Sequence, residues 1–151
     1  MDEHPIAHAT ETEGLVDRLV SLHGEGGLCP TADDWHRIFA AGGTAPVSLL
    51  NLLKFRAEID GPSGPISGAD AYRHYAADNA AAFARVGGEV VFFGDVGHVF
   101  GLGPVDDWDA AIVTRYPTAA SLAQMWLDPE FVTAHQNRLD GVARSQVLVF
   151  G

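Results

Sequence analysis

The chain has little cysteine and little positive charge, and it lacks long apolar runs. Cys29 is the sole cysteine in 151 residues, so no disulfide can form within the chain. Nine Lys and Arg residues stand against twenty Asp and Glu residues, which gives a net charge of -11 at pH 7. Because binding to nucleic-acid phosphates or to an anionic membrane needs a basic face, the composition excludes both as main partners.

The sequence also lacks a recognisable targeting or membrane segment. No apolar stretch approaches the length of about 20 residues that a membrane-spanning helix requires. The first residues, Met1 to Pro5, contain no basic region followed by an apolar one, which argues against a secretory signal peptide. Hydrophobic residues make up 47% of the chain and charged residues 19%, an ordinary globular balance. We therefore expect a soluble cytoplasmic protein.

Motifs for common cofactors and nucleophiles are missing as well. The seven histidines are scattered, and no pair combines zinc-ligand spacing with carboxylate support inside the expected core. No G-x-G-x-x-G opens a predicted helix, and no serine lies in a G-x-S-x-G motif. Cys29 lies in a glycine-rich turn without basic neighbours, so we interpret it as an ordinary loop thiol. The sequence predicts no metal and no built-in cofactor.

Two amphipathic helices are predicted in the first 45 residues. Thr10 and Glu13 have the spacing of a capping box, and the apolar pattern behind them ends at Gly24. A second box, Thr31 to Asp34, opens a helix that ends at Gly42. Each helix has an apolar face that needs a surface, so we expect both to pack on the remaining domain and to restrict access to its pocket.

From residue 46 onward, apolar runs alternate with helical patterns, and residues 56–67 form a loop rich in glycine and proline. Strands are predicted over 47–55, 89–95, 108–116 and 146–150, and helices over 69–86, 118–126 and 128–144. Residues 98–102 are a further hairpin candidate. The order β-α-β-β-α-β is that of an α+β, ferredoxin-like core, whose antiparallel sheet carries helices on one face only. The other face still has to be covered.

Particular residues of this core resemble a known family. They are Asn51-Leu52-Leu53-Lys54-Phe55, Tyr72, Tyr75, Gly87-Gly88, Trp108-Asp109, Arg115-Tyr116-Pro117-Thr118, Asp128-Pro129, Arg138 and Ser145. In this order they are similar to a small bacterial family of unknown function, made of dimeric α+β barrels with an N-L-L-K-F signature. The resemblance covers roughly residues 46–150 and leaves the first 45 residues outside it.

The resemblance implies a homodimer in which two sheets pack face to face across a two-fold axis and enclose ligand pockets. Related proteins in the superfamily include cofactor-free monooxygenases, muconolactone-type isomerases, polyketide cyclases and haem-dependent enzymes, so it implies a fold and a pocket rather than one reaction. The haem-dependent relatives leave His98 or His135 as an alternative haem ligand. We expect residues 1–45 to form a helical extension and residues 46–151 the barrel domain.

Polar residues at positions where the pattern calls for apolar ones are the candidates for chemistry. In the helix over 69–86, Tyr72 and Asn79 lie on the apolar stripe. In the last helix, His135 lies within the apolar arc and Arg138 lies at its edge, one turn away. A neutral imidazole held near an arginine is suited to act as a general acid or base near neutral pH. A purely structural role in the core is the alternative for each of these residues.

The strands supply further candidates. Asn51 and Lys54 lie on opposite faces of the first strand, so only one of them can line the pocket, and the sequence does not say which. We predict His135, Tyr72 and Arg138 as catalytic residues. The predicted substrate-binding residues are Asn51, Asn79, His98 and Trp108.

Two functions fit these residues. The first is a cofactor-free enzyme that uses acid–base chemistry in a barrel pocket, for cyclisation, isomerisation, dehydration or addition. Its substrate would be a small, largely apolar, enolisable metabolite such as a polyketide-like compound. The second is a non-catalytic protein that binds a small molecule in the same pocket, and a cofactor-free monooxygenase is a further alternative. We favour the enzyme.

Overall fold

A four-stranded antiparallel sheet with the order β4-β5-β1-β6 forms the centre of the molecule. The computed structural model describes residues 5–101 and 107–151, with side chains from residue 10 onward. The strands of the sheet are β1 (Val47–Phe55), β4 (Glu89–Asp95), β5 (Ala110–Tyr116) and β6 (Val142–Phe150). This order confirms the predicted α+β, ferredoxin-like fold.

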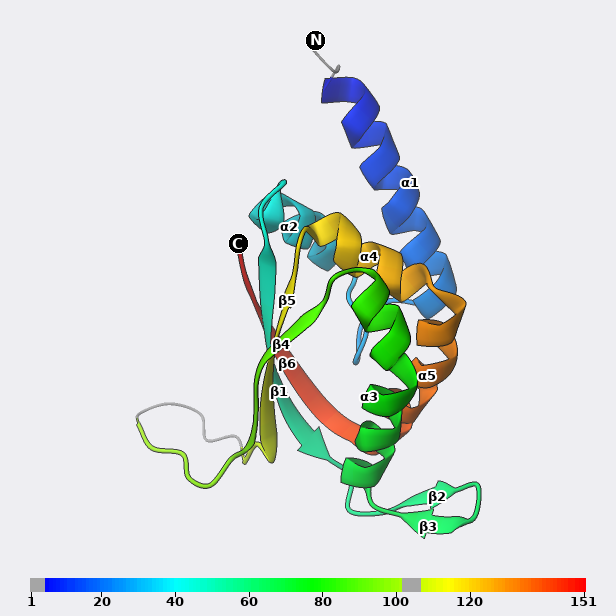
Figure 1. Ribbon diagram of the computed structural model, residues 1–151, viewed down its shortest axis with the longest axis vertical. Helices are drawn as coiled ribbons and strands as arrows, with labels where there is room; N and C mark the ends of the chain where they lie inside the picture. Colours follow the sequence, from blue (N-terminus) through cyan, green and yellow to red (C-terminus); the bar gives the residue numbers. More distant parts are fainter. Residues whose placement is uncertain (1–4, 102–106) are drawn as a thin grey trace.

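The helices cover one face of this sheet, as Figure 1 shows. Two of them, α3 and α5, pack against each other, and the N-terminal helices α1 and α2 pack against α4. The helices are α1 (Pro5–His23), α2 (Ala32–Gly42), α3 (Gly68–Arg85), α4 (Ala119–Leu127) and α5 (Pro129–Gly141). In the described part of the chain, no helix lies on the opposite face, which we call the open face.

Two glycines allow α3 and α5 to meet closely. A Cβ atom on Gly68 would collide with the backbone oxygens of Gly141 and Arg56, and one on Gly141 would lie 2.8 Å from the Cβ of Ala71. The same corner is held by backbone hydrogen bonds of 2.9 Å from Arg56 to Gly141 and from Gly68 to Arg56. This contact sets the spacing of the two helices that carry Tyr72 and Arg138.

The predicted helix starts were right at one capping box and wrong at the other. The Thr31 hydroxyl accepts a hydrogen bond from the Asp34 backbone at 3.0 Å, and the Asp34 carboxylate accepts one from the Thr31 backbone at 2.9 Å. In contrast, α1 already begins at Pro5, so Thr10 lies inside the helix. Proline is favoured at the first position of a helix, and this start overrides the weaker capping signal.

The last helix is shorter, and the last strand longer, than predicted. Helix α5 ends at Gly141 rather than near residue 144, and β6 begins at the buried Val142. The first residues of β6 pair with the end of β1, for example Ser145 with Leu53. Because β1 offers unpaired backbone groups along its whole length, strand pairing prevails over continued helix.

Two loop predictions also change. Residues 56–67, predicted as a loop, contain a small hairpin of β2 (Ile59–Gly61) and β3 (Gly64–Ile66). Three-residue strands are too short for an alternating pattern to be visible in the sequence. The proposed strand at 98–102 does not form over its described residues, where Val99 and Phe100 are exposed, and Leu102 lies outside the described residues.

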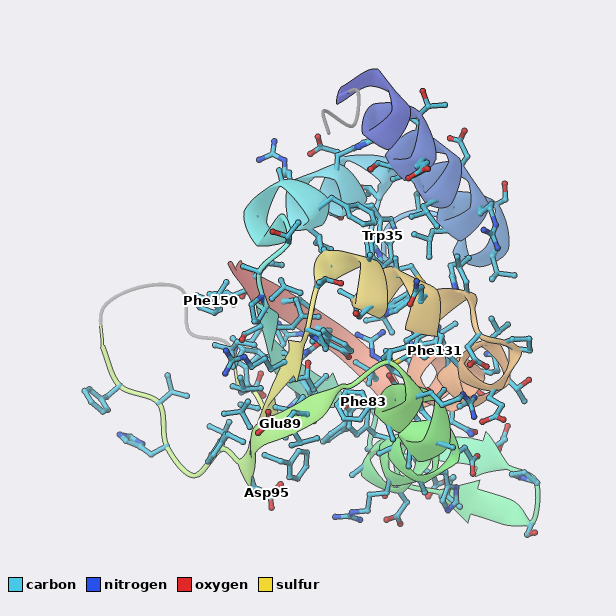
Figure 2. All side chains as sticks on the ribbon, turned by 45° about the horizontal axis from the view of Figure 1, so that its top comes forward. Trp35, Phe83, Glu89, Asp95, Phe131 and Phe150 are labelled. Atoms are coloured by element: carbon cyan, nitrogen blue, oxygen red, sulfur yellow. The ribbon has the colours of Figure 1, made fainter. Side chains whose placement is uncertain are left out.

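The N-terminal helices share one hydrophobic core with the sheet. Trp35 of α2 lies between α2 and α4 in Figure 2, and its ring is 5.5 Å from that of Trp126. Val16 and Leu19 of α1 belong to the same buried cluster. The packing on the rest of the chain that we expected is therefore present, while the division of the chain at residue 45 stays a prediction.

The two faces of the sheet differ in what covers them. On β1, Val47, Leu49 and Leu53 are buried beneath the helices, and the residues that alternate with this face, Ser48, Leu50 and Leu52, point to the open face. There, strand register places four apolar residues side by side: Phe92, Val113, Leu50 and Leu148. Phe92 is 56% exposed and Leu148 39% exposed, so the single chain leaves an apolar surface uncovered.

Candidate functional site

A cavity of about 500 Å³ lies between the helix-covered face of the sheet and the N-terminal segment. The sheet forms its floor, Tyr72 and Tyr75 of α3 and Arg138 of α5 form a wall, and α2 contributes Trp35 and Ile38. The turn before α2, residues 27–30, completes the lining. The volume lies within the range of small-molecule sites, and the walls are largely apolar.

The structure shows which face of β1 lines the cavity. Asn51 lines the cavity, together with Leu49 of the same strand face. Lys54 lies on the open side, where its ammonium group binds the carboxylates of Asp107 at 3.1 Å and Asp109 at 3.2 Å. This cavity is therefore not between two sheets, as the barrel-pocket prediction had it, but between one sheet and its own helices.

Arg138 is the buried charge of the cavity, with 6% of its surface exposed. Its Nη1 donates hydrogen bonds to the Leu28 carbonyl at 2.9 Å and to His135 Nε2 at 3.3 Å. Among the described residues, no carboxylate lies within ion-pair distance of the guanidinium. The bond to Leu28 joins α5 to the turn before α2, so Arg138 also holds the cover of the cavity in place.

His135 lies behind Arg138 rather than in the lining of this cavity. Its ring stacks on Phe131 at 4.8 Å and lies 4.7 Å from the Trp126 ring. Burial, followed by the nearby charge of Arg138, lowers the pKa of His135 to about 3. The imidazole is therefore neutral, and because Nε2 accepts from an arginine, its proton is on Nδ1. His135 adjoins the cavity only through Arg138.

Two tyrosines of α3, Tyr72 and Tyr75, line the cavity. Burial raises the pKa of Tyr72 and that of Tyr75, and the charge of Arg138 offsets only part of the rise. Both phenols are therefore neutral and can donate a hydrogen bond. Tyr72 was a predicted catalytic residue, whereas Tyr75 was not selected, although it lies on the same helical stripe three residues later.

Three predicted binding residues do not line this cavity. Asn79 is buried one layer away, where its Nδ2 donates to the Met125 sulfur at 3.6 Å. The ring of His98 stacks on that of Phe100 beyond the end of β4. Trp108 precedes β5, and its ring lies 5.1 Å from the guanidinium carbon of Arg144. Alternation along a strand could not place Trp108, because β5 begins only at Ala110.

Sequence reasoning missed the contribution of the N-terminal segment and of β6. Leu28, Trp35 and Ile38 line the cavity, although the sequence showed them only as a turn and an apolar helix face. Ser145 also lines it, and its hydroxyl is buried without a hydrogen-bond partner among the described residues. The sole signal in the sequence was that Ser145 is one of the residues that resemble the family. The resemblance did not assign a role to it.

Neither a metal site nor a membrane-spanning helix is found among the described residues. Among them, no group of three His, Cys, Asp or Glu side chains is arranged to hold a metal ion. None of the helices in these parts of the chain combines the length and the apolar character needed to cross a bilayer.

The fold is similar to that of a protein of unknown function from Rhodopseudomonas palustris. The two share 29% sequence identity with a TM-score of 0.72, over 83% of this chain and 96% of the other. The methylated form of that protein gives the same identity and TM-score, with 93% of its chain covered. A dabb-family protein with a ferredoxin-like fold from Mesorhizobium loti has 10% identity and a TM-score of 0.45, too weak to support an argument.

No family model matches the chain, and no curated protein matches it. Membership of the family with the N-L-L-K-F signature stays a prediction, as does the role of each candidate site residue.

Proposed function

We propose that the protein is a cofactor-free enzyme that binds a small, largely apolar, enolisable metabolite in the cavity and converts it by acid–base chemistry. The observation that carries this proposal is the combination of apolar walls with a few polar groups: Asn51, Tyr72 and Arg138. Such a combination orients a ligand and stabilises developing charge where water is largely excluded. Cyclisation, isomerisation, dehydration and addition all fit a site of this kind.

The polar groups divide into donors and a base. The neutral Tyr72 hydroxyl and the Asn51 amide are the donors for an enolate oxygen, and Arg138 adds positive charge. His135, whose Nε2 is bonded to the cavity residue Arg138, is the proposed base. In the proposed step, its Nε2 takes a proton from the carbon next to a carbonyl, and the electron pair of the C–H bond moves onto the carbonyl oxygen.

This step requires the bond between Arg138 and His135 to open. A ligand that draws the guanidinium toward the cavity removes a proton donor and a repelling charge from Nε2, and both changes raise the basicity of the imidazole. In the absence of a ligand, His135 acts as a positioning residue for Arg138.

Proton exchange on a simple ketone tests the proposal. 1-Tetralone is a mostly apolar bicyclic ketone that enolises slowly, and deuterium incorporation beside its carbonyl in D₂O can be followed by NMR. We expect the protein to accelerate this exchange, and His135→Gln to lower the enzymatic rate by on the order of 10²–10⁴. His36→Gln is the matched control, because His36 is a half-buried histidine of α2 that lies outside the lining.

The second candidate function is small-molecule binding without catalysis. It is favoured by the position of His135, which is buried behind Arg138 instead of facing the ligand. Binding of 1-tetralone without any acceleration of exchange would reject the enzyme and leave this function. Failure of His135→Gln to change an accelerated exchange would reject the base assignment alone.

We also propose that the protein is a homodimer whose two open sheet faces pack together. The central row of Phe92, Val113, Leu50 and Leu148 supports it, because soluble monomers rarely expose a contiguous apolar patch of this kind. A two-fold axis lets one copy cover the same surface on the other. Light scattering that gives the mass of one chain at micromolar concentration would contradict this proposal.

A further inference from the structure

We infer that the ligand of the cavity is a monocarboxylate with an apolar body, and that its carboxylate binds the inner edge of the Arg138 guanidinium. This inference rests on the proposed small-molecule function and narrows it to one class of substrate. The juxtaposition that carries it is a buried arginine, without a carboxylate partner among the described residues, in the wall of an apolar cavity.

The hydrogen bonds of Arg138 leave one edge of its fork unused. A guanidinium has five N–H groups, two on Nη1, two on Nη2 and one on Nε. The Leu28 carbonyl and His135 Nε2 both bind Nη1. Among the described residues, Nε and Nη2 have no acceptor. These two nitrogens form the edge that binds the two oxygens of a carboxylate side by side.

The acidic residues near the cavity are already engaged elsewhere. Asp34 lines the cavity, but its carboxylate accepts the Thr31 backbone N–H of the capping box at 2.9 Å. Asp33 binds the exposed Arg37 at 2.7 Å. Because buried charges in proteins are ordinarily paired, a cation buried to this extent without a protein anion indicates that the anion is brought by a ligand.

Other groups in the lining also suit a carboxylate. The Ser145 hydroxyl is buried and has no hydrogen-bond partner among the described residues, so it is available to donate. Tyr72 is kept neutral by burial, which raises its pKa, and it therefore offers a proton rather than a negative charge. The inner wall thus presents a cation and neutral donors to the ligand.

The charge balance favours a monoanion over a phosphate ester. Arg138 is the sole buried cation among the described residues that line the cavity, and Arg37 is exposed and already paired with Asp33. One guanidinium neutralises one carboxylate, whereas a dianionic phosphate would bury a second negative charge without a partner. The apolar walls then contact the hydrocarbon part of the ligand.

Matched probes that differ only in charge test the inference. 2-Naphthoate and 2-naphthamide have nearly the same shape, and their binding to the full-length protein can be compared by calorimetry. We expect 2-naphthoate to bind at least tenfold more tightly. Arg138→Met should abolish this preference and leave 2-naphthamide binding in place, whereas Arg138→Lys should keep part of it. Arg73→Met is the matched control, because Arg73 is exposed and lies outside the lining, and it should leave the preference unchanged.

Each other outcome has a definite meaning. Equal binding of the two probes to the unmodified protein overturns the inference, even if no Arg138 variant folds, and leaves small-molecule binding standing. A preference that survives in Arg138→Met or disappears in Arg73→Met also overturns it. Tighter binding of 2-naphthyl phosphate rejects the monocarboxylate. If neither naphthyl probe binds, nor the smaller pair benzoate and benzamide, the proposed function fails together with the inference.

Discussion

The two faces of the sheet are made by the same strands, yet they differ in polarity and in what covers them. The helix-covered face encloses a cavity and carries polar residues there, such as Asn51, Thr114 and Ser145. The open face has an apolar centre, although the single chain leaves it in contact with solvent. The covered face is thus the more polar of the two at its centre, which is the reverse of an ordinary one-sided sheet.

The residues on the two faces therefore have different energetic costs. Polar groups beneath the helices cost stability unless they are paired, so their presence at a cavity supports the proposed ligand. Apolar groups on an uncovered face cost solubility unless a second surface covers them, so their presence supports the proposed dimer. Changes to neighbouring residues of β1 can therefore test each face separately.

The largest effect is expected from a charge at the centre of the open face. Leu50 has Val113 and Leu148 as its register neighbours, so Leu50→Asp would bury a carboxylate in the proposed dimer contact. We expect the dissociation constant of the dimer to rise at least 1000-fold, roughly 4 kcal/mol. Light scattering over a dilution series measures it. An unchanged dimer would show that this face is not the contact.

Truncation on the covered face of the same strand should act on stability instead. Leu53 is fully buried beneath the helices and lies three residues from Leu50. Leu53→Ala should lower the free energy of unfolding by about 3 kcal/mol through lost packing and a residual cavity. Urea denaturation at fixed protein concentration measures this loss. The dimer dissociation constant should stay unchanged, and a large change in it would mean that the two faces are coupled.

Acid should lower the stability of the folded protein through His135, which is buried beneath the helices. Its pKa is lowered to about 3 in the folded protein by burial and by Arg138, so the unfolded chain binds this proton first as pH falls. The stabilisation is complete above the ordinary histidine pKa and is lost as pH falls toward 3, by roughly 1 kcal/mol between pH 6 and pH 5.

Denaturation at a series of pH values tests this dependence. His135→Gln should flatten the stability profile between pH 6 and pH 4. Equal slopes for the His135 variant and the unmodified protein would contradict a buried neutral imidazole.

The smallest effect is expected at Asn79, which is buried beneath the helices but outside the cavity. Its Oδ1 has no hydrogen-bond partner among the described residues, and its Nδ2 has only the Met125 sulfur. Because the amide gains little from its surroundings, Asn79→Leu should change the free energy of unfolding by less than about 1 kcal/mol. Thermal denaturation measures the change. A loss of several kcal/mol would contradict this expectation and show that the Asn79 amide makes a stabilising polar contact.

Much of the fold followed from local pattern. Three features each depend on neighbours within a few residues: the nine-residue run of β1, of which six residues are apolar, the capping box at Thr31 and the Asp128-Pro129 helix start. Such features are visible in a sequence because their energetics are local. The end of α5 was misjudged because β1 lies far away in sequence and its pairing with Val142–Ser145 overrides helical preference.

The sequence by itself determined the α+β class, the order of the elements, and the placement of Tyr72, His135 and Arg138 on inward-facing helix stripes. Only the tertiary structure decided that Arg138 faces a cavity while His135 lies behind it, and that Asn51 rather than Lys54 lines it. The bond from Arg138 to Leu28 joins residues 110 positions apart. Helical and strand periodicity report whether a side chain is covered, but the partner that covers it depends on long-range contacts that no local pattern encodes.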